Sequence, residues 1–264
     1  MRIDFHTHVF PPKLAAGAID HLAKASGYLP ETDGTIEGLL AKMDAWGVDT
    51  AVTANIAVTP RSEKKVNDFA IATNDLKRIV AFGSVHPASE NAISELYRLK
   101  AAGIRGIKLH PEYQEFDIDD PTAYPIYETC QSLGLVILFH AGFDVAYPNS
   151  RKSYPDRAAN VIREFPALNI VLAHFGANRG TEEVHKTLIG QHVYFDCSLI
   201  YEQGLTPAEA ENMIRAHGVD KILLATDCPW GSIPKAEAFL SEMNLTQSEL
   251  TQIRYGNAKR LLDI

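Results

Sequence analysis

IDFHTHV, at residues 3–9, is a short run of β-forming residues that ends just before Pro11. Side chains alternate sides along a strand, so His6 and His8 are predicted to point the same way, together with Asp4. Alone, such a pair of histidines is more often two polar residues facing solvent. However, imidazole is the commonest protein ligand for zinc and its neighbours, and one strand holds two such ligands rigidly. The stretch therefore predicts part of a metal site, with Asp4 supporting it from behind.

Composition and charge are those of an ordinary globular protein. The chain has 264 residues, of which 46% are hydrophobic and 22% are charged. The 25 basic and 33 acidic residues give a net charge of −8, which opposes binding to nucleic acid or to anionic lipid. No apolar run approaches the roughly 18 residues of a membrane helix, and the three cysteines are scattered, which fits a reducing compartment. We therefore predict a cytoplasmic protein with no nucleic-acid or membrane partner, and leave a homodimer open.

A unit of helix, glycine and short apolar strand repeats along the chain after residue 35. Thr206-Pro207-Ala208-Glu209 has the pattern that begins a helix, and a further helix is expected near 14–24. An α/β fold, the (β/α)8 TIM barrel, is favoured over a nucleotide-binding sheet because no Gly-x-Gly-x-x-Gly loop follows the first strand. Residues 1–264 are expected to form one domain. The predicted strands are 3–9, 50–56, 79–85, 106–109, 136–140, 170–174, 193–198 and 222–226.

Histidines gather where the predicted strands end. Reactive side chains of such barrels lie at the carboxyl ends of the strands. Taken singly, a histidine at the tip of a buried strand is more often a hydrogen-bonded core residue than a ligand. Six at one rim favour a functional site there over coincidence. Of the ten histidines in the chain, these six are His6, His8, His86, His110, His140 and His174.

Asp227 follows the mostly apolar stretch 222–226, where a buried carboxylate needs a partner. The first and eighth strands are neighbours in a closed barrel, so Asp227 is expected beside His6 and His8. There it can bind a metal ion and accept a proton from a water whose pKa the ion lowers to about 7. His174 is then placed to orient that water or to polarise the substrate.

Lys108 and His110 share a face of the fourth predicted strand. A lysine that points into a barrel can pack its stem inside and pair its ammonium with a carboxylate at the rim. Alternatively, Lys108 binds an anionic substrate group or, when carboxylated, bridges a second metal ion. His86 and His110, each followed by a proline, are expected to contact the substrate at most.

Six segments at these positions resemble the amidohydrolase superfamily, and in particular the amidohydrolase-related group that includes aminocarboxymuconate semialdehyde decarboxylase and the resorcylate decarboxylases. They are DFHTH at 4–8, GIKLHP at 106–111, FHAG at 139–142, AHFG at 173–176, TDCPW at 226–230 and GNAKRLL at 256–262. The resemblance spans nearly the whole chain. It implies a single divalent ion, zinc with manganese as the alternative, and a catalytic water held by His174. The implied ligands are His6, His8, His140 and Asp227.

The resemblance also limits the chemistry. Two-metal members of the superfamily use a carboxylated lysine on the fourth strand, so Lys108 keeps two ions as an alternative to one. The implied reaction is hydrolysis of an amide, ester or lactone, or loss of carbon dioxide from an aromatic or unsaturated acid. Decarboxylases of the group tend to be longer, so we expect a metal-dependent hydrolase of a small molecule, with a carboxylate-bearing substrate as one option.

Two alternatives to the hydrolase stay open, a non-oxidative decarboxylase, which is a carbon–carbon lyase, and a metal-binding scaffold without activity. We rank the scaffold last because it has no need for both Asp227 and His174. Loops 10–34, 111–121, 143–153 and 228–234 are expected to set the substrate. The candidate catalytic residues are Asp227, His174 and Lys108, and the candidates for substrate binding are His110, His86 and Trp230.

Overall fold

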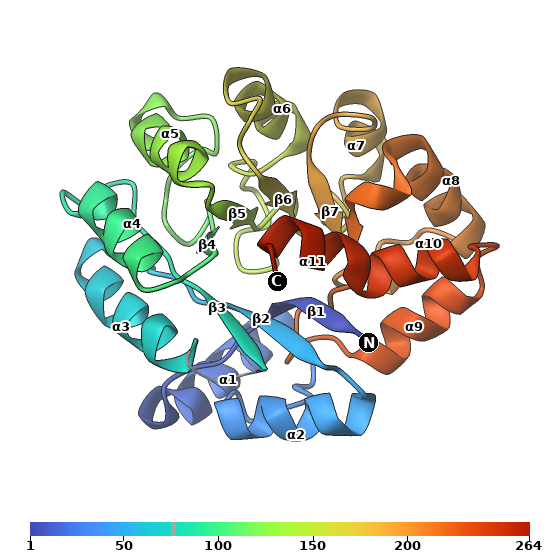
Figure 1. Ribbon diagram of the computed structural model, residues 1–264, viewed down its shortest axis with the longest axis horizontal. Coiled ribbons are helices and arrows are strands. Elements are labelled where there is room, and N and C mark those ends of the chain that lie inside the picture. The colour runs from blue at the N-terminus through green and yellow to red at the C-terminus, as the bar shows by residue number, and fades with distance from the viewer. Residues whose placement is uncertain (75–77) are drawn as a thin grey trace.

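The computed structural model describes residues 1–74 and 78–264. Its parallel strands form a ring that the helices surround (Figure 1). Each strand lies within the range predicted from the sequence, so the fold prediction is confirmed. The strands are β1 (Ile3–Thr7), β2 (Thr50–Ala54), β3 (Ile79–Phe82), β4 (Gly106–Leu109), β5 (Val136–Phe139), β6 (Ile170–Leu172), β7 (Tyr194–Asp196) and β8 (Ile222–Leu223).

The ring closes through two seams between its two sheets. β1 to β3 form one sheet and β4 to β8 form the other. A parallel bridge between Gly83 and Ile107 joins the two sheets at β3 and β4. At the other seam, the Phe5 N–H donates to Leu224 O at 2.9 Å, just past the end of β8. The first and last strands are therefore neighbours, as the site prediction requires.

Helices cover the outside of the ring, and several of their ends follow the sequence signals. Thr206 begins α8 with the predicted capping box, in which its side chain accepts from Glu209 N. Gly47 and Gly134 end α2 and α5 in the left-handed conformation, with φ of 67° and 63°. The helices are α1 (Pro12–Ser26), α2 (Ile36–Trp46), α3 (Glu63–Thr73), α4 (Ala92–Ala101), α5 (Tyr124–Leu133), α6 (Pro155–Glu164), α7 (Thr181–Thr187), α8 (Pro207–His217), α9 (Ile233–Ser241), α10 (Gln247–Thr251) and α11 (Asn257–Leu262).

Two apolar clusters hold the barrel together. One lies between strands and helices, and the other gathers alternate strand residues such as Phe5, Val52 and Leu138 inside the ring. Gly106 is part of this crowded interior, because a Cβ there would lie 2.6 Å from the Phe82 ring. Leu262 of α11 packs against the interior cluster. The inside of the barrel is thus a packed core, and reactive groups are left to its ends.

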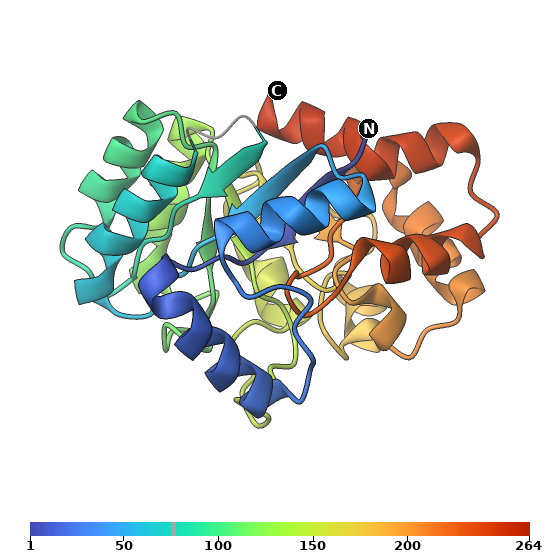
Figure 2. The same ribbon diagram turned by 90° about the horizontal axis from the view of Figure 1, so that it is seen from below.

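The two ends of the barrel differ. The chain enters β1 beside α11 at one end, while α1 lies towards the opposite end, where β1 finishes (Figure 2). The carboxyl ends of the strands therefore open on the side of α1. Among the described residues, no helix is long and apolar enough to cross a membrane.

The alternation predicted for β1 holds only in part. The pairing of β1 with β2 is irregular between Asp4 and Thr7. As a result, these side chains do not simply alternate between two faces. Phe5 packs in the interior cluster, and His6 and His8, which were predicted to lie on the other face, both reach the barrel mouth. A bulge of this kind adds a residue to one strand and re-aims the side chains after it.

His217, at the end of α8, gives a stability prediction that is independent of the site. Its Nε2 donates to Val193 O at 2.8 Å, and its ring stacks on Phe195 with centroids 3.9 Å apart. Burial lowers the pKa of His217 from 6.5 to about 4. The unfolded chain therefore takes up the proton first, so stability from neutral His217 is present above pH 6.5 and is lost as the pH falls towards 4.

We expect this loss to reach up to about 3 kcal/mol in the free energy of unfolding. Denaturant unfolding at a series of pH values should show a shallower acid dependence for His217→Gln than for the unchanged protein. His185→Gln, on the exposed side of α7, should keep the original dependence. Parallel acid dependence of His217→Gln and the unchanged protein would contradict this assignment.

Candidate metal centre

β1 and the segment after β8 bring two imidazoles and a carboxylate together at the barrel mouth. His6 Nε2 lies 3.1 Å from His8 Nε2. Asp227 Oδ1 lies 3.4 Å from His6 Nε2 and 3.0 Å from His8 Nε2. Asp227 reaches this position because its backbone N–H donates to His6 O at 2.8 Å, across the closing seam. The closure predicted from the sequence thus places these three side chains around one point.

The other ring nitrogens of the β1 histidines face hydrogen-bond acceptors. His6 Nδ1 donates to Asp196 Oδ2 at 2.9 Å, and His8 Nδ1 donates to Ala54 O at 2.9 Å. A neutral imidazole has a single N–H, so each Nε2 carries a lone pair. Two lone pairs and the Asp227 carboxylate therefore face one another, which favours a cation between them.

His140 and His174, after β5 and β6, add a second pair of nitrogens. His174 Nδ1 lies 2.9 Å from Ser198 Oγ, and the Ser198 hydroxyl itself donates to Asp196. Ser198 must therefore accept from His174 Nδ1, which leaves the lone pair on His174 Nε2. That atom lies 3.2 Å from His140 Nδ1. The His174 and His6 rings are neighbours, with centroids 5.7 Å apart, so both pairs belong to one cluster.

Lys108 supplies a positive group inside this cluster. Its side chain is buried, and Nζ lies 3.2 Å from His6 Nε2. Burial lowers the pKa of Lys108 to about 8, although Asp227 and Asp196 oppose the shift. Within the described residues the ammonium forms no ion pair with a carboxylate, so the pairing considered from the sequence does not occur. Lys108 instead approaches the lone pair that a metal ligand would offer.

Burial sets the protonation states of the cluster. It lowers the pKa of His6 to about 4 and lowers the pKa of His140 and His174 as well, so the rings are neutral near pH 7. Burial alone would raise the pKa of Asp227, but attraction to the protonated form of the His6 ring outweighs burial and holds that pKa below its ordinary range, so Asp227 is ionised before that ring loses its proton. Neutral imidazoles and an ionised carboxylate are the forms that bind a metal.

This donor set fits a divalent ion. Neutral imidazole nitrogen and carboxylate oxygen are ligands typical of zinc and of related first-row ions. Ligand atoms bound at about 2.1 Å in a tetrahedral site lie about 3.4 Å apart. The separations of 3.0 to 3.4 Å among His6, His8 and Asp227 match that spacing.

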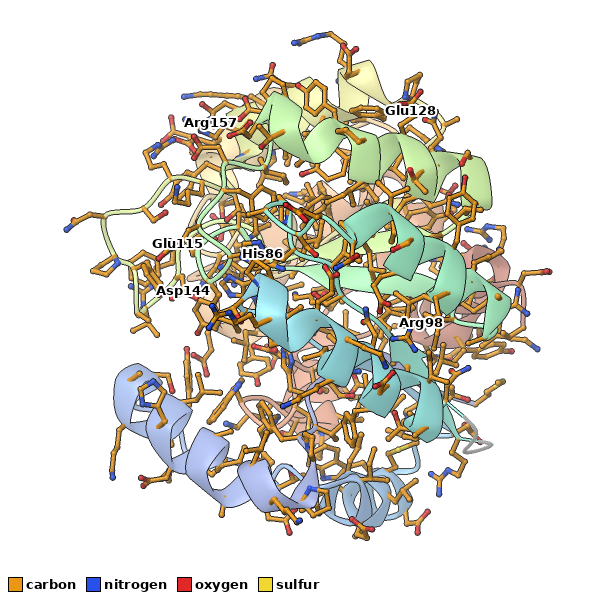
Figure 3. All side chains as sticks on the ribbon, turned by 90° about the vertical axis from the view of Figure 1, so that its left-hand side faces the viewer. His86, Arg98, Glu115, Glu128, Asp144 and Arg157 are labelled. Carbon is orange, nitrogen blue, oxygen red and sulfur yellow. The ribbon has the colours of Figure 1, made fainter. Side chains whose placement is uncertain are left out.

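A second group, formed by His110, His140 and Asp144, lies beside the first. Asp144 Oδ2 is 3.4 Å from His110 Nε2 and 3.8 Å from His140 Nε2. The His110 ring stacks on His140 at 4.2 Å and on Tyr113 at 3.8 Å. Asp144 comes from the loop after β5, at the same edge of the molecule as Glu115 (Figure 3). Sequence analysis predicted substrate contact for His110 and did not single out Asp144.

Two predicted substrate-binding residues do not join the cluster. The His86 N–H donates to Glu63 Oε2 at 2.8 Å, and His86 Nδ1 accepts from Ala88 N at 3.1 Å. In the described part of the chain, His86 makes no hydrogen bond or ion pair with the cluster. The Trp230 backbone N–H donates to Asp227 O at 2.8 Å, which stabilises the turn after Asp227. Substrate binding by His86 and Trp230 stays a prediction.

The carboxylate that accepts from the His6 ring is Asp196, which sequence analysis missed. Asp4, expected in that place, contacts His6 only through the backbone, where it accepts from His6 N at 3.3 Å. It also accepts from Thr226 N at 3.0 Å and from Thr226 Oγ1 at 2.6 Å. Burial raises the pKa of Asp4 to about 7, although these hydrogen bonds oppose the shift. A signal for Asp196 was present, because it closes the strand Tyr194–Asp196, where a buried carboxylate needs a partner.

The family model described as Amidohydrolase matches residues 3–264. The chain belongs to the amidohydrolase family. Membership of this family makes it a metal-dependent enzyme with a barrel fold, and the resemblance inferred from the six segments is confirmed.

Known amidohydrolase relatives include decarboxylases. The 2-amino-3-carboxymuconate-6-semialdehyde decarboxylase of Dictyostelium discoideum is 31% identical over 72 residues, which are 26% of this chain. The match spans 20% of the length of that relative.

Solved structures share the barrel along nearly the whole chain. A TIM-barrel protein of Bordetella bronchiseptica has a TM-score of 0.75 at 22% identity and covers 99% of this chain and 98% of its own. The 5-carboxyvanillate decarboxylase of Sphingomonas paucimobilis has a TM-score of 0.73 at 17% identity, with coverage of 100% and 99%. A dihydroxybenzoic acid decarboxylase of Polaromonas, with bound manganese and 2-nitroresorcinol, has a TM-score of 0.73 at 17% identity, with coverage of 99% and 96%. At these identities the likeness shows a common fold.

Proposed function

We propose that this amidohydrolase cleaves an amide, ester or lactone of a small molecule by activating water on one divalent ion. Zinc is the preferred ion and manganese the alternative. The observation that carries the proposal is the position of Asp227 Oδ1, 3.0 Å from His8 Nε2 and 3.4 Å from His6 Nε2, with both lone pairs turned towards it. Such a carboxylate can serve both as a ligand and as a base. The proposed ligands are His6, His8, His140 and Asp227.

Residues of the chain are assigned to proton transfer, to orientation of the water and to contact with the substrate. A divalent ion in this donor set would polarise a carbonyl group and acidify a water molecule. Asp227 accepts a proton from the attacking water and returns it to the leaving group. His174, held at Nδ1 by Ser198, accepts a hydrogen bond from that water at Nε2 and so orients it. Lys108 Nζ donates to the substrate oxygen on which negative charge develops.

Non-oxidative decarboxylation is the second candidate. The named relatives support it as strongly as the position of Asp227 supports hydrolysis, because decarboxylases appear both among curated proteins and among solved structures. In this alternative the substrate is an aromatic or unsaturated acid whose carboxylate the divalent ion would bind, and Lys108 contacts an anionic oxygen.

A metal-reconstitution experiment tests the two candidates together. Protein stripped with a chelator should be inactive and should regain full activity with one equivalent of zinc or manganese. A panel of amides, esters and lactones is assayed for hydrolysis, and a panel of hydroxylated aromatic acids is assayed for carbon dioxide. We expect hydrolysis without carbon dioxide release. Carbon dioxide release would replace the hydrolase with the lyase, uptake of two equivalents would favour the carboxylated Lys108 alternative, and uptake of no metal would reject both candidates.

A further inference from the structure

Residues 11–33 leave the barrel after β1 and return to the point where they began. The Phe10 N–H donates to Gly34 O at 2.8 Å, so the two ends of this segment meet. α1 forms its first part, and the chain turns back at Gly27, which has φ of 76°. α1 extends past the mouth of the barrel (Figure 2), whereas helices such as α4 pack on the outside of the ring (Figure 1). The segment can therefore move as a unit while its base stays attached.

α1 is loosely attached to the rest of the protein. Only Ala15 and Ile19 of its 15 residues are buried, whereas α4 buries four of its 10 residues. Leu14 of α1 is 61% exposed, and Leu29, shortly after the helix, is 89% exposed. A groove of about 430 Å³ lies between α1 and residues 30–35. Few buried apolar contacts give a segment low local stability, so this one can open while the barrel stays folded.

Two hydrogen bonds hold the tip of the segment across the mouth. The Glu31 N–H donates to Pro229 O at 2.8 Å, two residues after Asp227. The Tyr28 hydroxyl donates to the carboxylate of Glu202, which follows β7. Burial and the bond to Glu202 raise the pKa of Tyr28 to about 12, so the hydroxyl keeps the proton that it donates. The tip thus spans the ends of β7 and β8, from which Asp196 and Asp227 reach the metal centre.

The metal centre beside these contacts is nearly closed. Asp227 is 8% exposed, His140 is 6% exposed and His6 is 1% exposed. The negative charge of Asp227 also contributes to the raised pKa of Tyr28, so the tip of the segment lies near the centre. A small-molecule substrate needs a wider entrance than this, and the segment 11–33 is a weakly held element at its border.

We propose that residues 11–33 form a lid that opens to admit ligands to the metal centre, and that the hydrogen bond from Tyr28 to Glu202 holds the lid closed. Opening breaks the contacts of Tyr28 and Glu31, while the bond between Phe10 and Gly34 persists. Lids of this kind commonly control entry to an active site and release from it. Control of access to the metal rests on the proposed function, whereas opening of the lid does not.

Hydrogen exchange of the metal-free protein, followed by mass spectrometry, tests the opening. Tyr28→Phe removes only the hydroxyl, so we expect the amides of α1 to exchange about fivefold faster, with the amides of β5 unchanged. Glu202→Ala should have the same effect. The double variant should exchange no faster than either single variant, because one hydrogen bond is lost in all three. Tyr97→Phe is the matched control, because Tyr97 is 56% exposed on α4, and it should leave the exchange of α1 unchanged.

Zinc transfer from the loaded protein to a competing chelator tests the control of access. A lid that opens more often speeds uptake and release together, so Tyr28→Phe should transfer zinc about fivefold faster at unchanged equilibrium affinity. A loss of affinity in Tyr28→Phe would instead make Tyr28 a structural support of the metal centre and overturn the proposal.

Two further results would also reject the proposal. Unchanged exchange of α1 in both Tyr28→Phe and Glu202→Ala would show that their hydrogen bond does not hold the segment closed. Faster exchange of α1 with an unchanged rate of zinc transfer would show that the segment opens without controlling access. If the unchanged protein binds no zinc, the proposed function fails, and hydrogen exchange still decides whether Tyr28 and Glu202 hold the lid closed.

Discussion

Asp227→Asn is expected to lower turnover by about 10³-fold while the protein stays folded. The amide cannot accept a proton from the attacking water, and its neutral oxygen is a weaker metal ligand than the carboxylate. The backbone hydrogen bond from Asp227 N to His6 O does not depend on the side chain, so the barrel seam should persist. Turnover is measured after metal loading, with metal content and thermal unfolding determined on the same sample.

Asp119→Asn is a suitable control for this variant. Asp119 accepts from Arg157 and from Asn160 at 2.6 and 2.8 Å, outside the metal centre. It should keep full turnover. If metal-loaded Asp227→Asn hydrolysed its substrate within tenfold of the unchanged protein, Asp227 would not be the base. Product analysis separates this outcome from decarboxylation, because loss of carbon dioxide requires no attacking water.

Much of the fold follows from local patterns in the sequence. Apolar runs such as 136–139 are long enough for a strand and too short for a helix, and the glycines that follow helices divide the units. Helix starts such as that at Thr206 are determined by a few adjacent residues. The irregular pairing between Asp4 and Thr7 is different, because it depends on how β1 meets β2 in space.

The residues of the candidate site also differ in whether local sequence patterns or contacts in space determine their positions. His6, His8 and Asp227 are predictable neighbours because barrel closure alone brings the end of β8 to β1. The partners behind them depend on side-chain geometry between strands, which no local spacing encodes. Asp4 and Asp196 are both acidic residues of strands, and only the structure shows that His6 Nδ1 donates to Asp196.

Asp196→Asn gives the second large effect, a loss of metal affinity between about tenfold and 100-fold. Asp196 is ionised, because the pKa is lowered to about 2 even though burial opposes this, with His6 the main stabilising neighbour. Oδ2 accepts from His6 Nδ1 at 2.9 Å, while Oδ1 accepts from His174 N at 3.0 Å. An amide places an N–H group where one of these acceptors stood, so either the proton of His6 moves to Nε2 or the loop after β6 shifts. Both changes remove a lone pair from the metal centre.

Zinc affinity measured with a competing chelator, together with nitrogen NMR of His6 in the metal-free protein, checks this prediction. Asp4→Asn is the matched comparison, because Asp4 is another buried carboxyl of the same barrel end and accepts from Thr226 Oγ1 at 2.6 Å. Since burial raises the pKa of Asp4 to about 7, its carboxyl is already protonated in part of the molecules at neutral pH, and a neutral amide changes little charge there. We expect the smaller loss of zinc affinity for Asp4→Asn. A larger loss of zinc affinity for Asp4→Asn than for Asp196→Asn, with the His6 proton undisturbed in Asp196→Asn, would show that Asp4 and not Asp196 supports the metal ligands.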